Sequence, residues 1–308
     1  RYARFKIKSI GKHYLTGLPT GLSLKDSKTI SNYGQSYGEW AEPMDVNAFA
    51  VSDFINPHPE ETTAYLVYML ETMMEIAQIL GKTQDKALYQ RHADIVRGGY
   101  RKLIETEKYS YDTDRQAKLV RPLYLKLLDE KQTEFAQARL LQALDHYGWR
   151  LGTGFLSTPF ILYVLADMDI EYAYRLLENE EMPGWLFMPK MGANTIWESW
   201  EGTQAQGGVA SLNHYSKGAV CEWLFGEMCG IQIGSENEYI IKPKIGGNIN
   251  HASCEYNGVY GKVKSEWRKN VDSITYRITV PANVFVKAIL PNGEHVCGAG
   301  VHEFTVLK

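Results

Sequence analysis

The apolar residues of this 308-residue chain change their spacing once, near Gly234, and this change restricts the fold to two different parts. Before it, apolar residues recur every three or four positions, most clearly over residues 66–80, which is the spacing of an amphipathic helix. After it, β-branched and aromatic residues alternate with polar ones, as they do in strands. We therefore expect a helical domain over residues 1–233 and an all-β domain over residues 234–308.

The helical part is predicted to form a toroid of helix pairs. Its first 60 residues are rich in Gly, Ser, Asn and Pro and are predicted to be long loops, which usually carry function. Wide apolar stripes with Ala and Gly at close-approach positions favour an (α/α)6-type helical barrel, incomplete at its N-terminal side, in an α+β multidomain chain. The helices are expected at residues 61–80, 84–104, 115–128, 130–147, 156–166, 170–179 and 215–228.

The second part is predicted to be a small antiparallel β-sandwich. Pro281, residues 291–293 and residues 298–300 have the composition of turns between its strands. A role in stabilising the barrel is favoured over a carbohydrate-binding role, because exposed aromatic residues are few in the pattern. The strands are expected at residues 239–242, 261–267, 273–280, 284–290 and 302–307.

Charge and cysteine patterns exclude several classes of protein. The net charge is -3, with acidic and basic residues interleaved, so no basic stripe suits nucleic acid. No apolar run reaches the roughly 18 residues that span a membrane. The four cysteines are irregularly spaced and are expected to be free thiols, and the eight histidines show no metal-ligand spacing. We expect no metal and no cofactor.

Aromatic residues are dense and stand beside acidic ones, which is typical of carbohydrate sites. There are 7 Trp and 20 Tyr, and Glu198 lies between Trp197 and Trp200, ahead of a Gly-rich segment. A carboxylate flanked by indoles can be partly desolvated, which raises its basicity and suits a general base. The alternative is a surface glutamate beside core tryptophans, and the spacing alone leaves both open.

The same segment resembles the signature of glycoside hydrolase family 78, the α-L-rhamnosidases. The family pattern is Thr-Ile-Trp-Glu-Arg-Trp followed by Ser-Phe-Asn-His-Tyr, and this chain matches it over residues 195–200 and 211–215 except at Ser199 and Leu212. Further family-like blocks follow the expected order at residues 37–43, 153–158, 173–177 and 218–224. The resemblance covers nearly the whole chain.

This resemblance implies an inverting hydrolase that releases terminal α-L-rhamnose from plant glycosides or polysaccharides. Glu198 would be the general base, and His214 would bind sugar hydroxyls. Without the resemblance, His214 would be interpreted as a core or helix-start residue, and Asn213 as the N-cap of the following helix. The substrate would be a small glycoside, and a homodimer is compatible with the sequence.

The resemblance also implies a sugar pocket with aromatic walls. Glu39 and Trp40 stand where the family has a Gly-Asp-Trp loop, so Trp40 would contact the sugar and Glu39 would bind hydroxyls. Trp185, Trp197 and Trp200 would form further walls. The alternative for all of them is ordinary packing, and Glu42 and Asp45 in the same segment have no assignable role.

An inverting glycosidase needs a second carboxylic acid, roughly 6.5–9.5 Å from the first. In the family that acid lies in an Arg-Asp-Glu-Arg-like block upstream of the Gly-Asp-Trp loop, and this sequence has no such block. We expect the general acid to lie outside these residues, with Glu39 as a less favoured substitute.

Two other functions are compatible with the sequence, namely a sugar-binding or assembly fragment without turnover, and another helical-toroid glycosidase or phosphorylase. The compartment stays open, with a cytoplasmic location slightly favoured over secretion.

Overall fold

The computed structural model describes residues 1–12, 20–33, 37–47, 56–204 and 210–308. These residues form two compact units. The first comprises residues 1–164 and 179–216, and the second comprises residues 165–178 and 217–308. The second unit therefore includes helical residues that precede the predicted boundary at residue 234, and that boundary stays a prediction.

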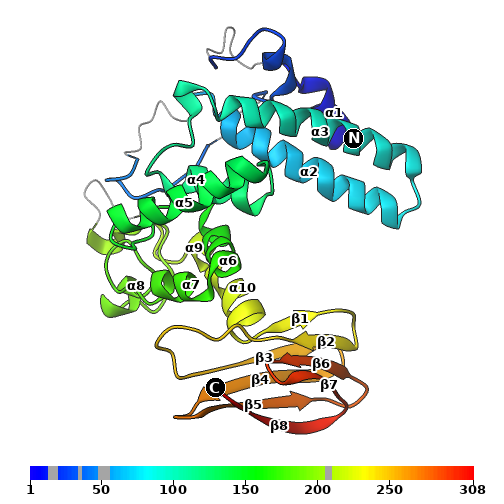
Figure 1. Cartoon of the computed structure of the whole chain (residues 1–308), viewed down its shortest axis with the longest axis vertical. Helices are drawn as coiled ribbons and strands as arrows, with labels where there is room; N and C mark the ends of the chain where they lie inside the picture. Colours follow the sequence, from blue (N-terminus) through cyan, green and yellow to red (C-terminus); the bar gives the residue numbers. More distant parts are fainter. Residues whose placement is uncertain (13–19, 34–36, 48–55, 205–209) are drawn as a thin grey trace. The chain divides into compact units, whose positions relative to one another are not determined.

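The first unit is built from helical hairpins (Figure 1). In the longest hairpin, α2 and α3 lie side by side, and Gly81, with a φ of 65°, allows the sharp reversal between them. Ala64, Leu70, Val96 and Tyr100 are fully buried in this unit. Its main helices are α1 (Tyr2–Ser9), α2 (Pro59–Ile79), α3 (Thr83–Leu103), α4 (Gln116–Tyr124), α5 (Glu130–His146), most of α6 (Thr158–Met168) and the short α8 (Phe187–Lys190).

Connections between these helices are of two kinds. Those from α2 to α3 and from α4 to α5 are short turns, whereas the segments that lead into α2, α4 and α6 and into α9 (Tyr215–Gly218) are long. Long connecting segments on a rigid scaffold are where binding and catalytic residues concentrate. Glycine-rich and aromatic blocks of the sequence fall in these long segments, so any site is expected at the amino ends of α2, α4, α6 and α9.

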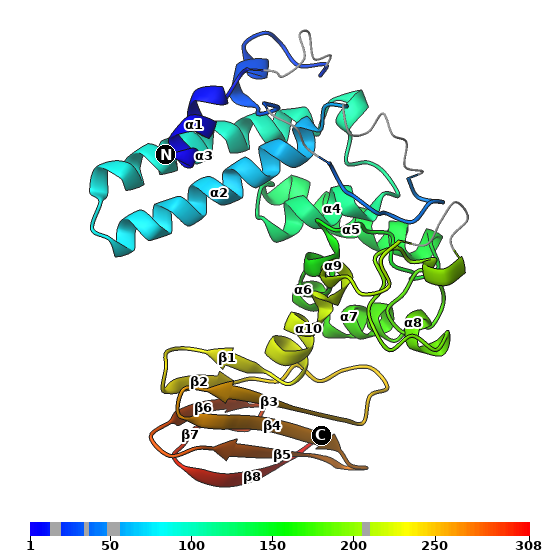
Figure 2. The same ribbon diagram turned by 180° about the vertical axis from the view of Figure 1, so that it is seen from behind.

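The second unit contains a sandwich of two four-stranded sheets, seen from both sides in Figures 1 and 2. One sheet has the strand order β1-β2-β6-β7 and the other β3-β4-β5-β8. The strands are β1 (Ile231–Ile233), β2 (Glu238–Ile241), β3 (His251–Gly258), β4 (Gly261–Lys269), β5 (Ser273–Val280), β6 (Phe285–Leu290), β7 (Gly293–Cys297) and β8 (Gly300–Leu307).

The sandwich is antiparallel except at one pair of strands. β2 and β6 run parallel, with Glu238 opposite Phe285 and Ile241 opposite Ala288. Parallel neighbours need a long crossover. Here β3, β4 and β5 of the other sheet lie between β2 and β6 in the chain. The predicted antiparallel order is thus wrong for this pair, while the helical barrel with a β-sandwich is confirmed.

Buried residues of the sandwich connect it to the preceding helix within the same unit. The fully buried Trp267 donates from Nε1 to the carbonyl of Met228 at 2.8 Å, and Ser265 donates from Oγ to the carbonyl of Cys229 at 2.6 Å. The second unit also contains α7 (Ile170–Leu177) and α10 (Val220–Trp223). All four cysteines are free, as predicted.

Several element predictions differ from the structure. Residues 215–228 form α9, α10 and a π-helical turn (Leu224–Met228) rather than one helix, and the early loop region contains α1. Strands β1, β3 and β7 were not predicted. Within the described ranges, no helix has both the length and the apolar content that a membrane span requires.

Candidate functional site

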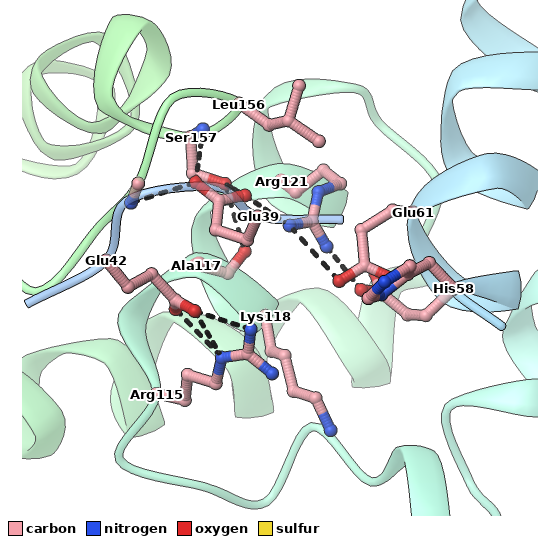
Figure 3. Close-up of polar contacts among 12 residues, drawn as sticks. Glu39, Glu42, His58, Glu61, Arg115, Ala117, Lys118, Arg121, Leu156 and Ser157 are labelled. Carbon is pink, nitrogen blue, oxygen red and sulfur yellow. Dashed lines mark hydrogen bonds and ion pairs between the residues drawn. The ribbon is translucent and has the colours of Figure 1, made fainter. Parts of the chain in front are cut away.

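Glu39 joins two of the long segments at the amino ends of the helices. Its carboxylate accepts hydrogen bonds from the backbone N–H of Gly154 at 3.0 Å and of Ser157 at 2.8 Å, and from Ser157 Oγ at 2.8 Å. Arg121 donates to it as well (Figure 3). Four donors fill the acceptor capacity of a carboxylate. Glu39 therefore fastens the segment that carries Trp40 to the segment that enters α6.

Arg121 is the centre of a buried charge network. It lies inside α4, is 0% exposed, and pairs with both Glu39 and Glu60, while Glu61 lies 4.0 Å from it. Tyr100 donates to the second oxygen of Glu60 at 2.6 Å. Burial raises the pKa of Glu60 more than Arg121 lowers it. Glu39, Glu60 and Glu61 thus share one guanidinium, so removing Arg121 would leave several buried carboxylates without a counter-charge.

The two acidic residues without an assigned role hold the same segment in place. Arg115 donates from Nε to both oxygens of Glu42 at 2.8 and 3.0 Å, and Tyr147 donates to Asp45 at 2.7 Å. Burial raises the pKa of Glu42 despite the opposing effect of Arg115. These pairs tie the segment after Trp40 to the segments entering α4 and α6.

Phe155 connects the Trp40 side of the site with the His214 side. Its backbone N–H donates to the Trp40 carbonyl at 2.8 Å, and its ring stacks on His214 with centroids 4.9 Å apart. Gly154 before it leaves no room for a side chain, because a Cβ there would overlap the Trp40 carbonyl oxygen and lie 3.1 Å from Glu39 Cγ. A glycine is thus required where these segments cross.

Replacing Gly154 with alanine is expected to lower the free energy of unfolding by about 1–3 kcal/mol, because the added methyl pushes the Trp40 backbone aside. Chemical denaturation measures this change. Gly98→Ala is the matched control, since a Cβ there meets nothing within 4 Å and Gly98 lies inside α3. That control should gain about 0.5–1 kcal/mol from helix propensity. Equal effects at both positions would contradict the close approach at Gly154.

The segment around Glu198 is hydrogen-bonded to the segment that leads into α9. Glu198 N–H donates to the Ser211 carbonyl at 2.9 Å, and His214 N–H donates to the Ile196 carbonyl at 2.8 Å. Ser211 N–H donates in return to the Glu198 carboxylate at 3.0 Å. Glu198 is half-buried. Among the described residues, Ser211 is the one donor to its carboxylate, which therefore keeps further acceptor capacity.

His214 occupies the position directly before α9. Its Nδ1 accepts the backbone N–H of Ser216 at 3.3 Å, so in the neutral ring the proton lies on Nε2. His214, and not Asn213, is therefore the capping residue of this helix. The ring lies between Phe155 and Tyr215, with which it stacks at 5.1 Å, and Nε2–H is the group that can donate to a ligand.

The tryptophans predicted for the site divide into two groups. Trp185, Trp197 and Trp200 are at most 5% exposed and pack into the interior, where Trp200 Nε1 donates to the Thr153 carbonyl at 3.3 Å. Trp185 and Trp200 meet edge to face at 6.3 Å. Trp40 is half-buried. Contact of these four tryptophans with a sugar stays a prediction. Trp197 and Trp200, which flank Glu198 in the sequence, are packed in the interior.

A cavity of about 370 Å³ opens beside Trp40 at the amino ends of α2 and α4. Trp40 meets Tyr37 edge to face at 5.8 Å on its wall. Glu42 and Glu61 also line it. Among the residues that the structure describes, no group of three or more His, Cys, Asp or Glu side chains is placed to hold a metal ion.

Sequence reasoning missed the Arg121 network. Glu60 and Glu61 follow Pro59 at the start of α2, where acidic residues are ordinarily explained by the helix dipole. Arg121 lies 61 residues from Glu60 and 82 from Glu39, so no local pattern joins them. The structure brings Glu39, Trp40 and His214 together through Phe155, which the sequence could not show.

Two family models match the chain. The bacterial alpha-L-rhamnosidase 6 hairpin glycosidase domain matches residues 17–228, and the bacterial alpha-L-rhamnosidase C-terminal domain matches residues 237–305. Similar curated proteins are alpha-L-rhamnosidases of Streptomyces avermitilis, 27% identical over 310 residues, and of Formosa agariphila, 29% identical over 274 residues. They cover 92% and 86% of this chain, which spans 29% of each relative.

Solved structures agree with these matches. The Streptomyces avermitilis alpha-L-rhamnosidase complexed with L-rhamnose has a TM-score of 0.78 at 26% identity, over 99% of this chain and 30% of that one. Native alpha-L-rhamnosidase from Aspergillus terreus has a TM-score of 0.75 at 26% identity, over 87% of this chain and 33% of that one. The chain thus spans about a third of the relatives it matches, and it belongs to the bacterial alpha-L-rhamnosidase family.

Proposed function

We propose that the protein carrying this chain hydrolyses terminal α-L-rhamnosides with inversion at the anomeric carbon, and that Glu198 is the general base. The observation that supports this most is the position of Glu198. Its carboxylate is half-buried, is fixed by Ser211 N–H at 3.0 Å, and lies on a segment bonded to His214. The names of the relatives, and the rhamnose complex of one of them, support the substrate class.

In the proposed reaction, Glu198 takes a proton from a water molecule while the water oxygen attacks C1 of rhamnose. A second carboxylic acid gives its proton to the departing glycosidic oxygen. The proposal assigns this acid to a part of the protein outside these 308 residues, since the Glu39 carboxylate is already occupied by four donors.

The remaining residues would bind and orient the sugar. His214 donates from Nε2 to a sugar hydroxyl, and Trp40 covers an apolar face of the ring. Glu39 holds Trp40 in place through Gly154 and Ser157, and its predicted contact with hydroxyls stays a prediction. The Glu198 segment is supported by the packing of three buried tryptophans, Trp185, Trp197 and Trp200.

A panel of p-nitrophenyl glycosides tests the substrate class. The protein is assayed as this chain and with whatever upstream sequence its gene encodes. We expect release of p-nitrophenol from the α-L-rhamnoside at least about 100-fold faster than from the β-D-glucoside or α-D-glucoside, because the pocket is complementary to one transition state. Hydrolysis of another glycoside with the rhamnoside untouched would contradict the proposal.

A further inference from the structure

The cavity at the amino ends of α2 and α4 has the size and lining of a small-molecule site. Its volume of about 370 Å³ lies within the range of about 300–1,000 Å³ that ligand pockets occupy. Trp40 and Tyr37 contribute aromatic surface, and polar side chains from α2 and α4 contribute donors and acceptors. Glu198 and His214 are not among its lining residues, and the cavity shares Glu39 and Trp40 with the site already described.

Glu61 differs from the other carboxylates of the cavity. Its side chain is 8% exposed, and the nearest cation, Arg121, is 4.0 Å away, which is beyond hydrogen-bond distance. In contrast, Glu39, Glu42 and Glu60 each accept at least two side-chain or backbone hydrogen bonds. Among the described residues, the Glu61 carboxylate has its own backbone N–H as a donor and no side-chain donor within hydrogen-bond distance.

Neighbouring cations favour the ionised form of Glu61. Burial raises its pKa, but Arg121, Arg115 and His58 together outweigh burial and lower it. Figure 3 shows Glu61 on the side of Arg121 opposite Glu39. A buried carboxylate whose hydrogen-bond donor among the described residues is its own backbone N–H is costly to ionise. Glu61 thus offers unused acceptor capacity to whatever fills the cavity.

Lys118 supplies the complementary donor. It lies on α4, lines the same cavity, and its Nζ makes one long hydrogen bond, 3.3 Å, to the Ser110 carbonyl. Burial lowers its pKa, and Figure 3 shows its amino group pointing away from Arg121. An ammonium group has three donors, and the described residues use one of them, so two are available to a ligand there.

The balance of charges favours a neutral ligand. Four acidic side chains line the cavity. Four basic side chains balance their charge, namely three that line the cavity and Arg121, which pairs with Glu39. The acidic residues are Glu39, Glu42, Glu60 and Glu61, and the basic ones are Lys108, Arg115, Lys118 and Arg121. Aromatic surface next to matched donors and acceptors suits a neutral polyhydroxylated ring.

We propose that this cavity binds a pyranose ring of the substrate, with Glu61 accepting hydrogen bonds from its hydroxyl groups and Lys118 donating to its oxygens. This inference rests on the proposed function, because it names the residues that hold one sugar unit of the rhamnoside. The unit is either the rhamnose itself or the sugar to which the rhamnose is attached.

Isothermal titration with two sugars tests the inference without turnover. The parent protein carries Glu198→Gln so that it does not hydrolyse the ligand, and L-rhamnose and a neutral α-L-rhamnosyl-glucose disaccharide are the probes. Adding Glu61→Gln should weaken binding about 10- to 100-fold, the effect of losing a hydrogen bond to a charged group. Lys118→Met should also weaken it, and this variant leaves the Arg121 network intact if Glu61→Gln does not fold.

The two probes show which sugar unit occupies the cavity, the rhamnose or the sugar to which it is attached. Weaker binding of both places rhamnose in the cavity, and weaker binding of the disaccharide alone places the second sugar there. Glu75→Gln is the matched control, because Glu75 lies on the same helix but is exposed. Unchanged affinity for both probes in Glu61→Gln and Lys118→Met would overturn the inference, whereas failure of the wild type to hydrolyse rhamnosides would overturn the proposed function.

Discussion

Replacing Arg121 with methionine is expected to lower the free energy of unfolding by about 3–5 kcal/mol, the cost of leaving buried charges without their partner. Methionine is of similar length, so the cavity cost is small compared with the electrostatic cost. Glu39 and Glu60 would each lose the only cation that bonds to them among the described residues. Urea denaturation followed by circular dichroism measures the change.

Arg139→Met is the matched control for this prediction. Arg139 pairs with Asp112 and Asp114, whose side chains are 68% and 57% exposed. Water solvates these carboxylates when the partner is removed, so the loss should stay below about 1 kcal/mol. Similar losses at Arg121 and Arg139 would show that the buried network contributes no more than a surface pair.

The effect of Arg121→Met should also depend on pH. In the variant, burial without a cation favours the protonated form of Glu60, so the pKa of its carboxyl is raised further. Protonation removes the unpaired charge, so the difference in stability between variant and wild type should shrink as the pH falls from about 7 to about 5. A difference that grows over this range would contradict the argument.

Replacing Glu198 with glutamine is expected to lower kcat for an α-L-rhamnoside by about 10²- to 10⁴-fold, which is the contribution of a general base. The glutamine oxygen can still accept from Ser211 N–H, so the segment keeps its conformation. KM should change little, because the substrate is bound mainly by other groups. Steady-state kinetics with the p-nitrophenyl substrate separates kcat from KM.

Glu201→Gln provides the control in the same segment. Glu201 is a glutamate of intermediate exposure three residues further along the chain, and its substitution should leave kcat within about 2-fold, as for a surface charge without a role in the reaction. A large loss of kcat in Glu201→Gln, with Glu198→Gln active, would move the base assignment from one carboxylate to the other.

The helical hairpins were predictable because local signals define them. Apolar residues at helical spacing followed by a glycine located α2 to within a few residues, and α5 is preceded by Asp129, whose side chain forms a capping box with Gln132. The prediction was worse where the chain bends. The helix starting at residue 116 ends at Tyr124, after Pro122 and before Lys126, which has a φ of 51°.

The sandwich was predicted less completely, because pairing rather than local sequence forms some strands. β3 contains His, Ser, Cys, Glu and Asn, which are not strong strand formers, and its burial alternates only between exposed and intermediate. It is a strand because it pairs with β4 over its whole length, from His251 opposite Arg268 to Gly258 opposite Gly261. The parallel β2–β6 pair is likewise a long-range contact.

The residues of the candidate site stay a prediction, and their arrangement could not be read from the sequence. Glu198, His214, Glu39 and Trp40 were proposed from motif blocks, whereas the connection between Trp40 and His214 depends on Phe155, which has no chemical signal of its own. The burial of Trp200 likewise involves a contact distant in the chain, its hydrogen bond to the Thr153 carbonyl. Sequence patterns identify residues with suitable chemical groups, whereas tertiary packing determines which of these groups can contact a ligand.

The proposal for this protein is most directly tested by the configuration of the sugar that is released first. Proton NMR of an α-L-rhamnoside during the first minutes of hydrolysis distinguishes the two anomers before they interconvert. A water activated by Glu198 attacks the face opposite the leaving group, so β-L-rhamnose should appear first. Initial release of α-L-rhamnose would contradict the general-base role of Glu198, and release of no rhamnose would contradict the proposed activity itself.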